Sequence, residues 1–106
     1  MAEEIIILIT AGSSAEATTI ARALVDEHLA ACVNVFPGVR SLFLWEGKTQ
    51  EADEVLMICK SRKPLMDAVI ARVQSLHSYT VPEIIALPVT AGLPSYLAWV
   101  TEATNG

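Results

Sequence analysis

The stretch CVNVFPGVRSLFLWEGKTQEADEVLMICK, residues 32–60, decides the fold because it has the pattern of one long β-hairpin. Apolar and β-branched residues predict strand structure in three segments, 32–36, 39–45 and 54–60. Pro37-Gly38 bends or breaks the first strand, and Glu46-Gly47-Lys48 indicates the turn. A two-stranded ribbon of this length is marginally stable alone, and its unpaired edges are open to another chain. The hairpin therefore indicates an oligomer.

The segment before the hairpin predicts one strand and one helix. Residues 4–10, EIIILIT, form a continuous apolar run, which is typical of a strand that is central in its sheet or covered on both faces. Ser13 and Glu16 have the spacing of a capping box and mark a helix start. Apolar residues then recur at helical spacing from 17 to 29, which places His28 on or beside the buried face as a packed or border histidine.

The segment after the hairpin predicts a second helix, a fourth strand and a closing helix. Pro64 stands where the first residue of a helix belongs, and an apolar stripe runs over 65–76. Residues 83–89 predict a strand, in which Pro88 indicates an edge position. Residues 94–103 predict a short helix that ends the fold.

This order of elements, β-α-β-β-α-β plus a terminal helix, predicts an α+β, ferredoxin-like single domain over residues 1–106. Two right-handed crossovers would place both long helices on one face of a four-stranded antiparallel sheet. The other face would stay open. We expect Phe43, Trp45 and Met57 to need cover from other copies of the chain.

Composition excludes several classes of partner. The chain is 53% hydrophobic, which favours a buried core over disorder. Its longest apolar run, residues 5–9, is far shorter than the ~20 residues that cross a bilayer. The net charge is −5, so nucleic acid and anionic membranes are poor partners. The acidic start MAEE lacks the basic region of a secretory signal, which predicts a cytoplasmic protein.

The sequence predicts that the protein is not an enzyme. It contains neither G-x-S-x-G nor H-E-x-x-H, and no nucleophile with a base and an orienting acid is visible. Cys32 and His77 are conceivable as a pair, but the apolar context of Cys32 does not favour a reactive thiolate. Cys32 and Cys59 are expected to be buried and reduced. The AGSS segment before the first helix predicts a helix cap, since it matches no phosphate-binding motif.

Several motifs, in order, resemble the CutA divalent-ion tolerance family. They are LAAC at 29–32, PG at 37–38, SLFLWEGK at 41–48, EVLMICK at 54–60, H-x-Y-x-x-PE at 77–83, LPV at 87–89 and YLAW at 96–99. The resemblance covers nearly the whole chain. It implies a tight homotrimer in which the hairpins of neighbours complete one another's sheets, in agreement with the argument from the hairpin. It also implies a link to divalent-metal tolerance and copper binding, and an architecture similar to the PII proteins, which bind small effectors between subunits.

His77 is the candidate metal ligand, and a structural or hydrogen-bonding role at a subunit cleft is the alternative. The resemblance implies the sequence HPY at this position, often preceded by a second histidine. It also implies that copper-binding members carry a cysteine on the first strand. Here Leu76 and Ile9 occupy those two positions, and Ser78 replaces the proline. Copper(II) favours several nitrogen or oxygen donors, so one imidazole per subunit makes a weak site, even if Glu83 adds a carboxylate. We expect copper or another divalent cation to bind weakly or adventitiously, with no cofactor required.

A ligand cleft is the second candidate site. Its predicted residues are Trp45, Lys60, Tyr79, Glu83 and Trp99, which combine aromatic surface with a few charges as small-molecule pockets do. Tryptophan and tyrosine are equally typical of subunit interfaces. The sequence therefore leaves three functions open: a CutA-type protein of metal homeostasis, a PII-like sensor whose cleft and Lys60 hold a small anionic metabolite, and a structural trimer that presents a surface to other proteins.

Overall fold

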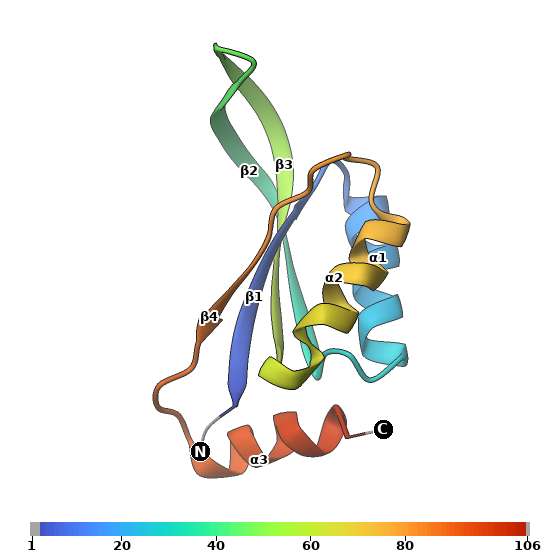
Figure 1. The fold of residues 1–106 in the computed structure, drawn as a ribbon, viewed down its shortest axis with the longest axis vertical. Helices are drawn as coiled ribbons and strands as arrows, with labels where there is room; N and C mark the ends of the chain where they lie inside the picture. The colour runs from blue at the N-terminus through green and yellow to red at the C-terminus, as the bar shows by residue number, and fades with distance from the viewer. Residues whose placement is uncertain (1–2, 106) are drawn as a thin grey trace.

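The computed structural model describes residues 3–105, which form one antiparallel sheet with two long helices on one face and a shorter helix across one end (Figure 1). Its elements are β1 (Glu4–Ala11), α1 (Ser14–Asp26), β2 (Cys32–Trp45), β3 (Lys48–Arg62), the short 3-10 helix η1 (Lys63–Leu65), α2 (Met66–Leu76), β4 (Ile84–Pro88) and α3 (Pro94–Ala103). The strand order is β2-β3-β1-β4. The predicted α+β order of elements is confirmed, and Pro88 lies on an edge strand as expected.

β1 lies at the centre of the sheet, between β3 and β4, as its continuous apolar run predicts. Its side chains alternate between a fully buried face, which carries Ile7 and Ile9, and a half-buried face. Helices α1 and α2 cover the buried face (Figure 1) and contribute the buried residues Ile20, Leu24, Val69 and Val73. The core of the chain is therefore the layer between these two helices and one face of the sheet.

The start of α1 is capped by Ser13, whose Oγ accepts a hydrogen bond from the Glu16 N–H at 3.1 Å. The reciprocal half of the predicted capping box is not formed. Glu16 instead accepts from the N–H and the Oγ of Ser78, at 2.6 and 2.9 Å. The carboxylate thus joins the first turn of α1 to the loop that follows α2.

The end of α1 corrects the predicted helical stripe. The helix ends at Asp26, and His28 has a left-handed backbone with φ 61° and an exposed side chain. The N–H groups of Leu29 and Ala30 both donate to the Leu24 carbonyl, which closes the last turn as left-handed caps do. His28 is therefore a surface residue beyond the helix, and its Nδ1 lies 3.2 Å from the Ala103 carbonyl oxygen.

The β2-β3 hairpin extends well beyond the end of β1 (Figure 1). Its two strands pair from Cys32 and Lys60 to Trp45 and Lys48, with an irregularity at Pro37-Gly38. Glu46 and Gly47 have φ values of 52° and 76°, as a two-residue turn that follows the strand twist requires. β3 therefore begins at Lys48 and not at residue 54, because the ladder continues through polar residues.

Met57 corrects one expectation about the open face. Its side chain is fully buried in the core. Met57 stands opposite Ile9 in the sheet, so both residues point to the face that the helices cover. Phe43 and Trp45, in contrast, keep 42% and 51% of their surface exposed, which leaves both available for contact with another chain.

α3 lies across the end of the sheet opposite the hairpin tip (Figure 1). Arg62, the last residue of β3, donates from Nε to the Thr104 hydroxyl at 2.8 Å and from Nη2 to the Thr104 carbonyl at 3.2 Å. Among the described residues, none of the helices has the length and apolar character that a membrane crossing requires.

The two cysteines are free, and they differ in burial. Cys59 is fully buried, and its burial raises the pKa of the thiol to about 12. Cys32 is only partly buried, at the start of β2, where its Sγ lies 3.9 Å from the Lys60 Nζ. The expectation of a buried residue is thus confirmed for Cys59 alone.

Candidate functional site

His77 is held inside the chain by both of its ring nitrogens. It directly follows α2, and its side chain is fully buried. Nδ1 accepts a hydrogen bond from the Tyr79 N–H at 3.0 Å, so the ring carries its proton on Nε2. Nε2 donates to the Thr10 carbonyl at 2.7 Å. The imidazole therefore ties the loop after α2 to the end of β1, and no lone pair is free for a metal ion.

The surroundings of His77 offer few additional ligands. The nearest carboxylate is Glu16, whose Oε2 lies 3.4 Å from Nδ1 and also accepts from Ser78. Glu83, the carboxylate that the sequence suggested as a second ligand, lines a cavity beside Tyr79. Within residues 3–105, no three His, Cys, Asp or Glu side chains gather closely enough to hold a metal ion. Metal binding at His77 stays a prediction, and it would require breaking one of the two hydrogen bonds.

Tyr79 lies beside His77, with the ring centroids 4.7 Å apart. Its hydroxyl donates to the Oε2 of Glu54, at 2.9 Å, on β3. Burial, followed by the hydrogen bond to Glu54 and the nearby negative charge, raises the pKa of Tyr79 to about 12, so the hydroxyl keeps its proton. Gly12 makes room for this contact, since a Cβ there would lie 3.3 Å from the tyrosine oxygen.

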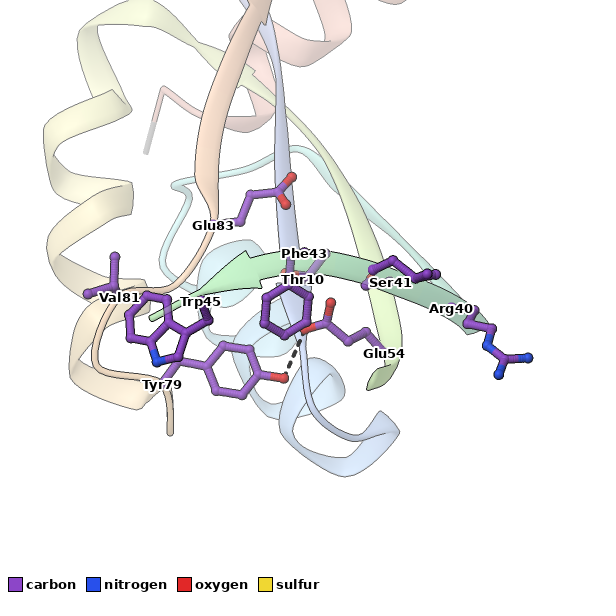
Figure 2. A pocket seen from close by; sticks show the side chains of 10 residues that line it. Thr10, Arg40, Ser41, Phe43, Trp45, Glu54, Tyr79, Val81 and Glu83 are labelled. Atoms are coloured by element: carbon purple, nitrogen blue, oxygen red, sulfur yellow. Dashed lines mark hydrogen bonds between the residues drawn. The ribbon is translucent and has the colours of Figure 1, made fainter. Parts of the chain in front are cut away.

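A cavity of about 480 Å³ opens beside this pair (Figure 2). Thr10, Phe43, Trp45, Glu54, Tyr79 and Glu83 are among the residues that line it. Three of the five predicted cleft residues, Trp45, Tyr79 and Glu83, are therefore brought together. Glu54, which is only 8% exposed, also lines the cavity but was not among the predicted cleft residues. Glu54 ends the polar run QEADE, and this run carries no signal of the contact with Tyr79.

The other two predicted residues lie elsewhere. Lys60 contacts the Asn34 side chain and lines a second cavity, of about 200 Å³, that extends to Tyr96 on α3. Trp99 is also on α3, half exposed, with its ring 5.5 Å from that of Tyr96. Lys60 follows Glu54 by six residues on the same strand, a separation of about 20 Å. A site that uses all five residues would therefore need two copies of the chain.

The chain has a ferredoxin-like α+β fold with a protruding hairpin, and its relatives share this architecture. The family model of the CutA1 divalent ion tolerance protein matches residues 5–103. The divalent-cation tolerance protein CutA of Thermus thermophilus is 46% identical over 102 residues, which cover 96% of this chain and 99% of that protein. The chain belongs to the CutA1 divalent ion tolerance family. This is a family of tolerance proteins rather than enzymes, as the sequence predicts.

Solved structures of relatives agree closely with this fold. The Thermus thermophilus protein superposes with a TM-score of 0.93 at 46% identity, over 94% of this chain and 97% of that one. CutA from Archaeoglobus fulgidus, described as periplasmic, gives 0.92 at 44% identity, over 95% and 98%. The chloroplastic protein CutA of Arabidopsis thaliana is 41% identical, and this chain spans 56% of its length. Because these names place relatives in different compartments, a cytoplasmic location stays a prediction.

Proposed function

We propose that this chain acts as a cytoplasmic homotrimer in divalent-metal tolerance, and that it binds copper only weakly or adventitiously. Membership of the CutA1 family over residues 5–103 is the observation that carries the tolerance role. The test measures the growth of cells that lack the gene at raised Cu²⁺ concentration. The deletion should increase sensitivity, and the native chain should restore growth. Equal growth with and without the gene would contradict the tolerance role.

The trimer is supported by apolar surface that the chain does not cover by itself. Leu42 and Leu44, near the hairpin tip, are 65% and 73% exposed. Ile85 and Leu87, on the edge strand β4, are about half exposed on the sheet face opposite the helices. Covering apolar surface stabilises an assembly by ~25 cal/mol per Å². Sedimentation velocity at micromolar concentration should give a trimer, whereas a monomer would contradict the proposal.

Weak copper binding is supported by the occupied ring of His77. The test is a calorimetric titration of Cu²⁺ into the native chain, His77→Ala and His28→Ala, which together remove each histidine of the sequence in turn. We expect weak binding without fixed stoichiometry that does not depend on His77. Micromolar or tighter binding at a fixed ratio, abolished in His77→Ala and kept in His28→Ala, would make His77 a true ligand and refute weak binding.

The second candidate function is a PII-like sensor of a small anionic metabolite. The observation that favours it is Lys60, which brings a positive charge to the cavity beside α3. Thermal unfolding with a panel of carboxylates and phosphate compounds tests this function. A stabilising anion whose effect is lost in Lys60→Gln and retained in Lys63→Gln would support the sensor. No response to any anion would leave metal tolerance as the better explanation.

A further inference from the structure

The large cavity beside Tyr79 combines two kinds of group that attract positive charge. Glu54 and Glu83 contribute carboxylates, and Phe43, Trp45 and Tyr79 contribute aromatic rings (Figure 2). The faces of aromatic rings carry partial negative charge, and cations bind to them. A pocket with apolar walls and a few directional polar groups is typical of small-molecule sites. The lining thus favours a positively charged ligand over the anion that Lys60 would serve.

The positive group nearest to this cavity is already engaged. Arg40 contributes to the lining, but its Nε and Nη2 both lie 2.6 Å from the Oε1 of Glu51. Figure 2 shows its side chain pointing away from the aromatic rings. In the part of the chain that the structure describes, neither Glu54 nor Glu83 forms a salt bridge. The cavity therefore presents two carboxylates whose charge is not balanced by an ion pair with any residue from 3 to 105.

The arrangement of Glu54 suits an organic cation better than a metal ion. Its Oε2 accepts a hydrogen bond from the Tyr79 hydroxyl, which orients the buried carboxylate. The described residues provide no cluster of three metal-binding side chains, here or elsewhere. An ammonium group needs only one or two acceptors, because aromatic rings can surround the remainder of its charge. The volume of about 480 Å³ is also far larger than a bare ion requires.

We infer that this cavity binds a small organic cation, either a primary amine or a quaternary ammonium compound. The carboxylates of Glu54 and Glu83 hold the charged group, and the rings of Phe43 and Trp45 contact the apolar body. This inference goes beyond metal tolerance and does not depend on the copper result. The proposed cation site consists of side chains of one chain only and does not include Lys60, so it is independent of the anion site proposed there.

The test compares ligands of one shape and three charges. Choline, its neutral isostere 3,3-dimethylbutan-1-ol and the anion 3,3-dimethylbutanoate are titrated into the native protein and followed by NMR. A second pair, n-butylammonium and 1-butanol, repeats the comparison for a primary amine. We expect at least one cation to bind about tenfold or more tightly than its neutral partner, as expected when ring and carboxylate contacts add. We expect the anion not to bind.

Matched variants then locate the site. Glu54→Gln keeps an acceptor for the Tyr79 hydroxyl but removes the negative charge. Glu83→Gln removes the other negative charge at an exposed position, where a substitution disturbs folding less. Each should reduce the preference for the cation over its neutral partner. Asp53→Asn is the control, because it removes the same charge from an exposed residue next to Glu54 that does not line the cavity.

Thermal unfolding and sedimentation are measured for each variant to check that it keeps the native assembly. Three results would overturn the inference: no preference for either cation over its neutral partner, preferential binding of the anion, or a cation preference that both glutamine variants leave intact. The first would also result if a neighbouring copy fills the cavity with its own side chains.

Discussion

Replacing His77 with alanine should destabilise the fold strongly, because the buried ring connects two segments that are far apart in the sequence. The substitution leaves the Thr10 carbonyl and the Tyr79 N–H without their partners. The Thr10 carbonyl is part-buried, and leaving such a group unpaired costs about 1–3 kcal/mol, whereas the exposed Tyr79 N–H can bond to water instead. Together with the packing lost when the fully buried ring is removed, this gives an expected loss of about 2–5 kcal/mol in the free energy of unfolding, within the range of severe single substitutions.

Urea denaturation at one fixed protein concentration measures this loss, since the stability of an oligomer depends on concentration. His28→Ala is the matched control. Its imidazole is exposed and, within the described residues, reaches only the Ala103 carbonyl at hydrogen-bond distance, so its removal should change stability by less than about 0.5 kcal/mol. Equal, small effects of the two substitutions would refute the structural role of His77 and would restore it as a candidate metal ligand.

Three further predictions concern the core, the loop after α2 and alkaline pH. Met57→Ala should cost about 2–5 kcal/mol in urea denaturation because Met57 is fully buried; a cost near zero would place it outside the core. Glu16→Ala removes the acceptor of both Ser78 hydrogen bonds, so amide hydrogen exchange in residues 77–83 should become faster while β1 stays protected; unchanged exchange would contradict the link. The folded chain raises the pKa of Tyr79 from 10.0 to about 12, so between these values the unfolded chain loses this proton first and stability should fall as pH rises. Tyr79→Phe should reduce that fall in denaturant midpoints between pH 9 and 12, to which Cys59 also contributes; an identical fall in the variant would contradict the assignment.

The order of elements could be predicted from the sequence because each element carries its own periodicity. β1 reads as a central strand, and α1 and α2 show apolar stripes at helical spacing. The errors occur where neighbouring segments decide the local structure. The stripe continues past Asp26, but the chain must turn there to enter β2, and the left-handed backbone of His28 ends the helix.

The face of the sheet that Met57 occupies could not be read from its own strand. Every residue from Val55 to Cys59 is apolar, so this run shows no alternation between an inner and an outer side. Only the register against β1, which sets Met57 opposite Ile9, fixes its side as the one covered by helices. A shift of one residue would have made Met57 part of the open face, where the sequence pattern had led us to expect it.

In the candidate site, too, residues that belong to local motifs could be predicted, whereas contacts between distant segments could not. Aromatic and acidic residues in family motifs pointed to Trp45, Tyr79 and Glu83, which the structure gathers around one cavity. The burial of Glu54 depends on Tyr79, which arrives from the loop after α2 and needs the space at Gly12. No pattern within a single segment carries that information.

The hairpin surface that another copy could cover also forms part of the wall of the large cavity. Its exposed end carries Phe43 and Trp45, and both rings also line the large cavity. A neighbouring copy that covers this apolar surface must therefore either close the cavity or complete its wall. Lys60 and Trp99 lie toward the end of the sheet that α3 crosses, opposite the hairpin tip. Only the Lys60 and Trp99 of a second copy could therefore reach the same cavity. If the trimer forms and Lys60→Gln does not change cation binding, the cavity is completed by other groups, and the predicted five-residue cleft is two separate sites.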